Sequence, residues 1–159
     1  KKYYDDKYRI IEKVENASNF KFPIEYDSNL EKFSNKFLGK GNKTKGFLFL
    51  SAYGIKNNLY NDFKSKENNK EIYRANTGGP ELRNGLGSFL VCNAYHYFLN
   101  VDKSIKKFED IFEKKPEDIV YVSTISAIGA LDYIFDEIGW TESRDIPKEL
   151  YDELESDDW

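Results

Sequence analysis

The sequence has little of the chemistry that disulfides and zinc sites require. Its 159 residues include one cysteine, Cys92, and one histidine, His96. A single cysteine excludes a disulfide within the chain, and one cysteine with one histidine cannot supply the full ligand set of a zinc site. Because Cys92 stands among apolar neighbours in FLVCNAY, we expect it to be a buried small hydrophobic residue rather than a nucleophile.

Long apolar runs and an excess of positive charge are also missing. No apolar run approaches the ~20 residues that cross a bilayer, so we expect no membrane span. The formal net charge is −4 and charged residues of both signs make up 33% of the chain. This composition offers no basic face to a phosphate backbone, so we expect no nucleic-acid partner. The chain begins at KKYYDD with no initiator methionine and no visible signal peptide, and we expect a soluble, mature or trimmed product.

Aromatic residues, by contrast, are abundant. The chain has 12 Tyr, 12 Phe and 2 Trp, and 40% of its residues are hydrophobic. This content suffices for a packed core, and the length suits one domain with a small helical appendage. In the first part, residues 3–14 show helical spacing. A second helix is predicted over 28–38, capped by Asp27 or Ser28 and closed at Gly39. Residues 45–54 fit either a strand or a helix.

The pattern changes after the polar, Asn- and Lys-rich stretch 56–70. We expect a helical extension over 1–68 and a core over 69–159, packed together as one unit. The segment DIVYVSTIS alternates β-branched and aromatic residues, which is typical of a strand. The predicted elements of the core are strands at 71–76 and 118–126 and helices at 87–100, 102–115, 127–139 and 146–155. Together they predict an α+β fold with a small mixed or antiparallel sheet.

Three short motifs occur in one order along this core. They are IYRANTGGPELRNG (72–85), GSFLVCNAYH (87–96) and VYVSTIS (120–126). Together they resemble the amino-terminal half of the mono-ADP-ribosyltransferase toxins, in the branch of pertussis and cholera toxin. Tyr73 and Arg74 stand at the family's Tyr-Arg, His96 lies on its histidine-bearing helix, and Ser123 with Thr124 begins its Ser-Thr-Ser motif. Gly79 and Ile125 depart from the family pattern.

The resemblance implies an ADP-ribosyltransferase-like fold and a transferase that uses NAD as its substrate and modifies a protein target, in a secreted toxin fragment. Arg74 would hold the anionic pyrophosphate with its guanidinium fork. Glu155, or Glu153, would place a carboxylate at the ribose, and the Ser123 hydroxyl would hold that carboxylate. The residues that would contact the dinucleotide are Tyr73, Arg74, His96 and Thr124.

Each of these residues also has a purely structural interpretation. Arg74 fits an ion-paired surface residue, and His96 fits a hydrogen-bonded core histidine. Ser123 and Thr124 fit the N-cap of the helix that follows them. The acidic segment around Glu155 fits a solvated helix face.

Two other functions remain open from the sequence. The first is a non-catalytic acidic binding protein, such as an inhibitor, immunity protein or antitoxin, which neutralises a basic partner through aromatic residues and complementary charge. The second is an acetyl-CoA-dependent N-acyltransferase. Its pyrophosphate-binding Gly-x-Gly turn resembles NGLGSFL (84–90), with Gly85 and Gly87 before a helix.

Overall fold

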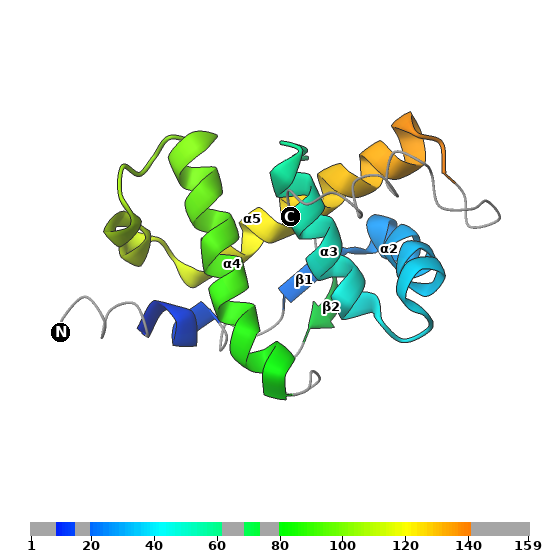
Figure 1. The fold of residues 1–159 in the computed structure, drawn as a ribbon, viewed down its shortest axis with the longest axis horizontal. Helices are drawn as coiled ribbons and strands as arrows, with labels where there is room; N and C mark the ends of the chain where they lie inside the picture. Colours follow the sequence, from blue (N-terminus) through cyan, green and yellow to red (C-terminus); the bar gives the residue numbers. More distant parts are fainter. Residues whose placement is uncertain (1–8, 15–19, 62–68, 74–79, 141–159) are drawn as a thin grey trace.

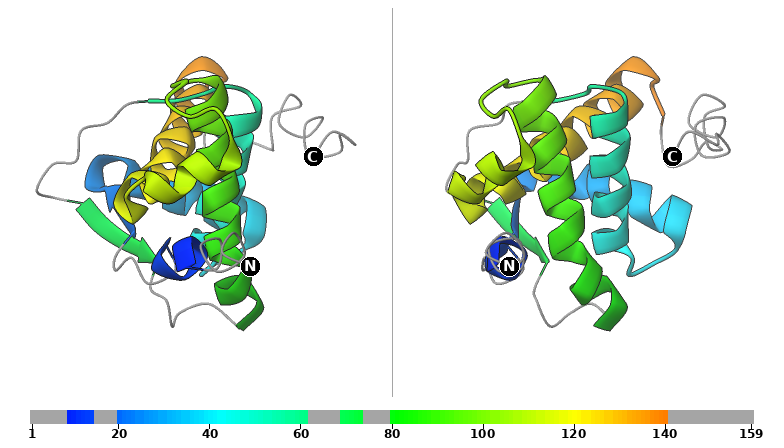
Figure 2. Two further views of the ribbon diagram at one scale, coloured as in Figure 1. Left: turned by 90° about the vertical axis from the view of Figure 1, so that its left-hand side faces the viewer. Right: turned by 60° about the vertical axis from the view of Figure 1, so that its left-hand side comes forward.

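The computed structural model describes residues 9–14, 20–61, 69–73 and 80–140. Residues 9–14 form a short helix. The elements that follow are β1 (Phe20–Pro23), α2 (Ile24–Leu38), α3 (Lys43–Lys56), β2 (Asn69–Tyr73), α4 (Pro80–Asn100), the 3₁₀ helix η1 (Phe108–Glu113), α5 (Pro116–Asp132) and the π-helical turn η2 (Tyr133–Glu137). Helices α4, α3 and α2 pack in that order along α5 (Figure 1; Figure 2, right).

The α+β expectation is wrong, because the described residues are predominantly helical. Within those residues, β-structure is confined to one antiparallel ribbon in which β1 pairs with β2. The strand predicted over 71–76 therefore corresponds in part to β2, but it has no sheet core around it. This architecture does not provide the central sheet on which an ADP-ribosyltransferase site is built.

The strand predicted over 118–126 lies inside helix α5. Pro116 occupies the first turn of this helix, and Glu117 and Asp118 add negative charge there. Proline with its preset φ and carboxylates near the positive end of the helix dipole both favour a helix start. Nearly every residue from Ile119 to Leu131 is buried. A helix that is apolar on all sides belongs in the core, and burial on all sides overrides the β-propensity of its branched residues.

Small residues let α3 approach α2 and α5 closely. A Cβ on Gly54 would overlap the backbone carbonyl of Ser126 in α5, and a Cβ on Gly46 would overlap the Ser34 side chain in α2. The hydroxyl of Ser51 donates across the α3–α5 contact to the Ser123 carbonyl, at 2.9 Å. Glycine and serine therefore determine how near these helices lie, and the larger core side chains pack around their contacts.

Helix α2 ends at Gly39, as predicted, where φ is 87°. Its start was predicted wrongly, since the helix begins directly after Pro23 and neither Asp27 nor Ser28 caps it. Asp27 lies one turn inside the helix, buried, and forms an ion pair with Lys43 at the start of α3. The pair satisfies a carboxylate that would otherwise be costly to bury.

The buried helix predicted over 87–100 is confirmed within α4, but α4 begins earlier, at Pro80. Gly85 and Gly87 consequently lie inside the helix rather than in a turn before it. The pyrophosphate-binding turn of an N-acyltransferase is therefore absent at this position. The helix predicted over 102–115 is reduced to η1, where Asp110 accepts hydrogen bonds from the backbone amides of Lys106 and Lys107.

Elements from both sides of residue 68 share one hydrophobic core. The β1–β2 ribbon joins residues 20–23 to residues 69–73, and α3 packs on α4 and α5. The core runs from Phe22 in β1 through Leu50 in α3 and Leu90 in α4 to Ile128 in α5. The segment 116–137 has the length and apolarity of a membrane span, but 67% of its most apolar window is buried in this core, as in a core helix.

Candidate functional site

Ser123 and Thr124, the predicted Ser-Thr pair, lie in the interior of α5 and are buried. The Ser123 hydroxyl accepts a hydrogen bond from Nδ2 of Asn93 in α4, at 3.1 Å. Its carbonyl accepts from the Ser51 and Ser126 hydroxyls. Ser123 of α5 thus makes polar contacts with both α3 and α4. It neither ends a strand nor caps a helix, and its exposed fraction of 0% keeps it out of any open cleft.

His96 lies on the exposed side of α4. Its Nδ1 is 3.4 Å from Nδ2 of Asn100, one turn later. Cys92, one turn earlier, is also exposed. The interpretations of His96 as a core histidine and of Cys92 as a buried residue are therefore wrong. Because Ser123 is fully buried and His96 faces solvent, the two do not line a common cleft.

The other predicted site residues are Tyr73, Arg74, Glu153 and Glu155. Arg74, Glu153 and Glu155 lie outside the described residues, and Tyr73 is the last residue of β2. Their roles in an ADP-ribosyltransferase site stay predictions.

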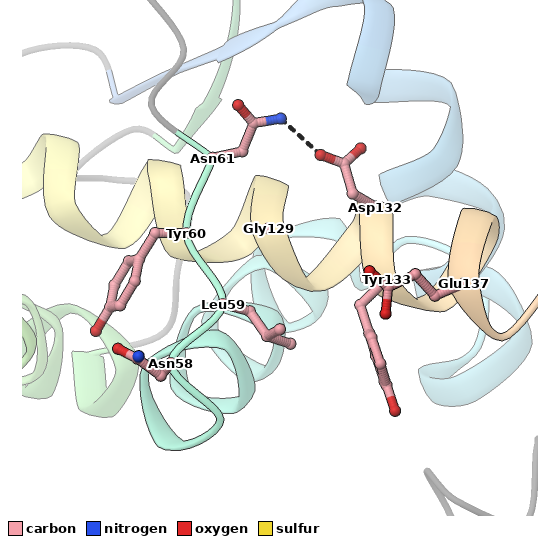
Figure 3. A pocket seen from close by; sticks show the side chains of 8 residues that line it. All are labelled: Asn58, Leu59, Tyr60, Asn61, Gly129, Asp132, Tyr133 and Glu137. Carbon is pink, nitrogen blue, oxygen red and sulfur yellow. Dashed lines mark hydrogen bonds between the residues drawn. The ribbon is translucent and has the colours of Figure 1, made fainter.

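A pocket lies elsewhere, where the segment that follows α3 crosses the second half of α5 (Figure 3). Its volume is about 280 Å³ and its lining residues are Asn58, Leu59, Tyr60, Asn61, Gly129, Asp132, Tyr133 and Glu137. The crossing depends on Gly129, because a Cβ there would lie 2.6 Å from the carbonyl carbon of Leu59. The amide of Asn61 donates to the Ile125 carbonyl, at 3.0 Å, and fixes the segment to the helix.

Asp132 is oriented by neutral hydrogen-bond donors. Nδ2 of Asn61 donates to its Oδ2 at 2.6 Å, and the two side chains point toward each other in Figure 3. The Tyr26 hydroxyl, from α2, also hydrogen-bonds to Asp132. Burial and the nearby charge of Asp136 nevertheless raise the pKa of Asp132. The carboxylate is thus held in place without a positive partner among these contacts.

The π-helical turn η2 brings a second carboxylate to the pocket. Residues five apart in an α-helix of 3.6 residues per turn point in different directions. In η2 the amide of Ile138 bonds to the carbonyl of Tyr133, at 2.9 Å, which is an i to i+5 bond. Such a turn changes the direction of the side chains that follow it relative to a regular α-helix. Asp132 and Glu137 are related by this spacing, and both line the pocket.

These carboxylates stand at the unfavourable end of a helix. Carbonyl groups at a helix C-terminus carry partial negative charge and attract cations. The last turns of α5 and η2 contain no basic residue, yet Asp132, Asp136 and Glu137 lie there. In the free protein this part of the surface therefore repels further negative charge, and a positive ligand would relieve the repulsion.

The opposite end of the pocket is aromatic. Tyr60 packs edge-on against Tyr97 of α4, with ring centroids 5.0 Å apart. Burial, together with the charge of Tyr97, raises the pKa of Tyr60 to about 12. Tyr60 is accordingly a neutral phenol at any physiological pH, and it contributes packing rather than proton transfer.

The pocket does not resemble a metal site. Among residues 9–14, 20–61, 69–73 and 80–140, no group of three or more His, Cys, Asp or Glu side chains converges as metal ligands would. Its volume lies at the lower edge of the ~300–1,000 Å³ of sites for drug-sized ligands. Two carboxylates, amide groups and a tyrosine ring in this space suit a small cation or a cationic side chain.

The sequence analysis missed this pocket, although it left two signals. Glycine inside an apolar helical segment, here Gly129, marks a place where another backbone approaches. Carboxylates at the end of a predicted helix without a compensating lysine, here Asp132 and Glu137, run against the helix dipole. The π turn that separates them has no sequence signature of this kind.

Comparison with known proteins gives no family for the chain: no family model, curated protein or solved structure matches it.

Proposed function

We propose that the protein is a non-catalytic binding protein that holds a basic protein partner through the pocket at the C-terminal end of α5. The observation that carries the proposal is the pair Asp132 and Glu137, which share one pocket at a helix end with no basic residue in its last turns. Carboxylates kept in such a position reduce stability and are explained by an interaction with a cation.

Other features of the chain support this function. The net charge of −4 favours encounter with a positively charged partner. Tyrosine rings beside the carboxylates, Tyr133 foremost, are of the kind that anchors protein interfaces. Inhibitors, immunity proteins and antitoxins act in this way, by covering a partner rather than by transforming it.

Fluorescence anisotropy with a labelled lysine- and arginine-rich peptide tests the proposal, with a glutamate-rich peptide of equal length as the negative control. We expect the wild-type protein to bind the basic peptide and to bind it more weakly as salt is added. The double variant Asp132→Asn/Glu137→Gln should bind at least about tenfold more weakly, because it removes both carboxylates that line the pocket.

The matched control is Asp102→Asn/Glu113→Gln, which removes the same net charge from exposed positions outside the pocket. Its affinity should stay within about twofold of the wild type, since neither charge lines the pocket and isolated exposed charges contribute little. Equal losses in both double variants would mean that only net charge matters, and the pocket would then have no binding role. Absence of binding by the wild-type protein would refute the proposal directly.

ADP-ribosyl transfer remains the rival proposal for function, and it rests on Arg74 and Glu155. NAD⁺ should raise the melting temperature if Arg74 lines a dinucleotide site, because a ligand that binds the folded state stabilises it. The change Arg74→Lys should abolish that rise and any NAD⁺ hydrolysis while leaving the fold intact. Unchanged hydrolysis in this variant would remove Arg74 from the reaction.

A further inference from the structure

We infer that the pocket takes the side chain of a single lysine, and prefers its ammonium group to the guanidinium of arginine. This inference rests on the proposed function and specifies the group of the partner that is recognised. It follows from the directions of the acceptors, the apolar walls and the volume of the pocket.

The acceptors of the pocket do not form the parallel pair that arginine prefers. Arginine binds a carboxylate best through two N–H groups that meet both of its oxygens side by side. Here Oδ2 of Asp132 already accepts from Asn61, at 2.6 Å. The Tyr26 hydroxyl also hydrogen-bonds to this carboxylate. Two donors already bound to Asp132 leave its carboxylate fewer acceptor positions for a planar fork.

An ammonium group fits this arrangement better. It carries three donors that rotate freely and can meet single oxygens lying in different directions. Asp132 precedes the π turn and Glu137 ends it, and both line the pocket. The Asp132 carboxylate points toward Asn61 (Figure 3). One ammonium between them would bond to both carboxylates. It would also offset their repulsion at the helix end.

The walls of the pocket suit the alkyl stem of a lysine. Leu59 and Tyr133, both half-buried, lie on either side of the space between the crossing segment and the helix (Figure 3). The Tyr133 ring is supported from behind by Tyr53 of α3, with centroids 6.3 Å apart. Long cationic side chains pack their methylene groups on such surfaces, and a tyrosine face also attracts the charge.

The volume of about 280 Å³ limits the size of the group that the pocket can hold. It lies just below the ~300–1,000 Å³ of pockets that enclose whole drug-sized molecules. One extended side chain fits this space, whereas a dinucleotide does not. The rest of a protein partner would then lie over the rim, which the segment from Asn58 to Asn61 forms.

NMR titration of the ¹⁵N-labelled protein compares its affinities for the ammonium group of lysine and the guanidinium group of arginine. The probes are Nα-acetyl-lysine methylamide and Nα-acetyl-arginine methylamide, with Nα-acetyl-norleucine methylamide as the uncharged control. We expect the lysine probe to shift the amides of Leu59, Gly129 and Tyr133, and to bind at least about fivefold more tightly than the arginine probe. The norleucine probe should shift none of them.

Two variants test whether binding of the lysine probe depends on Glu137. Glu137→Gln should abolish binding of the lysine probe. Asp136→Asn, which removes the same charge from the same turn but lies outside the pocket lining, should retain it. Because Glu137 is exposed, its replacement leaves the fold intact, and the unchanged amide spectrum outside the pocket verifies this.

Failure of this inference is distinguishable from failure of the proposed function. If the arginine probe binds as tightly as the lysine probe, or Asp136→Asn and Glu137→Gln weaken binding equally, lysine recognition is refuted while binding of the basic peptide still stands. If no probe shifts the pocket amides but the basic peptide binds, the partner is held by the surface and not by a lysine in the pocket. If the basic peptide does not bind either, both are wrong.

Discussion

Replacing Gly129 by alanine should dismantle the pocket and destabilise the protein. The new Cβ would lie 2.6 Å from the carbonyl carbon and 2.7 Å from the carbonyl oxygen of Leu59, and 2.7 Å from the amide nitrogen of Tyr60. All three atoms belong to backbone, so no rotation of a side chain relieves the overlap. The segment from Asn58 to Asn61 must instead move away from α5.

The size of the effect follows from three contributions. Overpacking of a closely packed contact costs about 1–3 kcal/mol. Displacement of the segment weakens two hydrogen bonds of Asn61, to the Ile125 carbonyl and to Asp132, each worth about 1 kcal/mol. Alanine returns about 1 kcal/mol through its higher helix propensity. We therefore expect a net loss of about 2–4 kcal/mol in the free energy of unfolding.

Urea denaturation followed by far-UV circular dichroism measures this loss. The fluorescence intensity of Trp140, which is buried in the core, gives a second probe. Gly41→Ala is the matched control, because a Cβ on Gly41 meets nothing within 4 Å. Its φ of 87° makes the control somewhat unstable, at about 1–2 kcal/mol, but the Asn61 amide should keep its hydrogen-exchange protection. Gly129→Ala with wild-type stability and a protected Asn61 amide would refute the close crossing on which the pocket depends.

Two further predictions concern the helix contacts and the titration of the pocket. Gly54→Ala should cost about 2–3 kcal/mol in urea denaturation, because its Cβ overlaps the Ser126 carbonyl; Ala52→Gly in the same helix should cost only about 1 kcal/mol, and an equal cost would contradict the tight contact. Since the folded pKa of Asp132 is raised above its ordinary value near 3.8, the folded state binds this proton more tightly than the unfolded chain. The contribution of Asp132 to stability is therefore highest below that value and is lost as pH rises through the raised pKa. Asp132→Asn should gain stability over the wild type at pH 7 and lose this gain at acid pH, and a parallel pH profile for the two proteins would contradict the burial of Asp132.

The sequence predicted α2 and α4 in part, but it assigned the first half of α5 to a strand. Gly39 ends α2, and the apolar segment 87–100 lies in α4, as expected. The failure at α5 came from weighing β-branched residues such as Val120 and Val122 above the start signal Pro116 with its acidic neighbours. Propensity is a weak guide when a segment is buried on every side, because packing then selects the structure.

The candidate site was harder to predict than the fold. Asp132 and Asn61 are far apart in the sequence. They meet because α3 packs on α5 at Gly54 and the segment that follows α3 crosses α5 at Gly129. Ser123 was predicted as a site residue because hydroxyl groups before an apolar run are typical of functional strand ends and of helix N-caps. Inside a helix the same hydroxyls satisfy backbone carbonyls, as the bond from Ser126 to the Ser123 carbonyl shows, at 3.0 Å.

The pKa of the Asp132 carboxyl group, measured by ¹³C NMR as a function of pH, tests the cation site most directly. In the free protein we predict a pKa above the ordinary value near 3.8, because the group is desolvated and close to Asp136. Addition of the lysine probe should lower this pKa, since a bound cation favours the charged form. An ordinary pKa that the probe leaves unchanged would contradict the proposal that this end of α5 binds a positive charge.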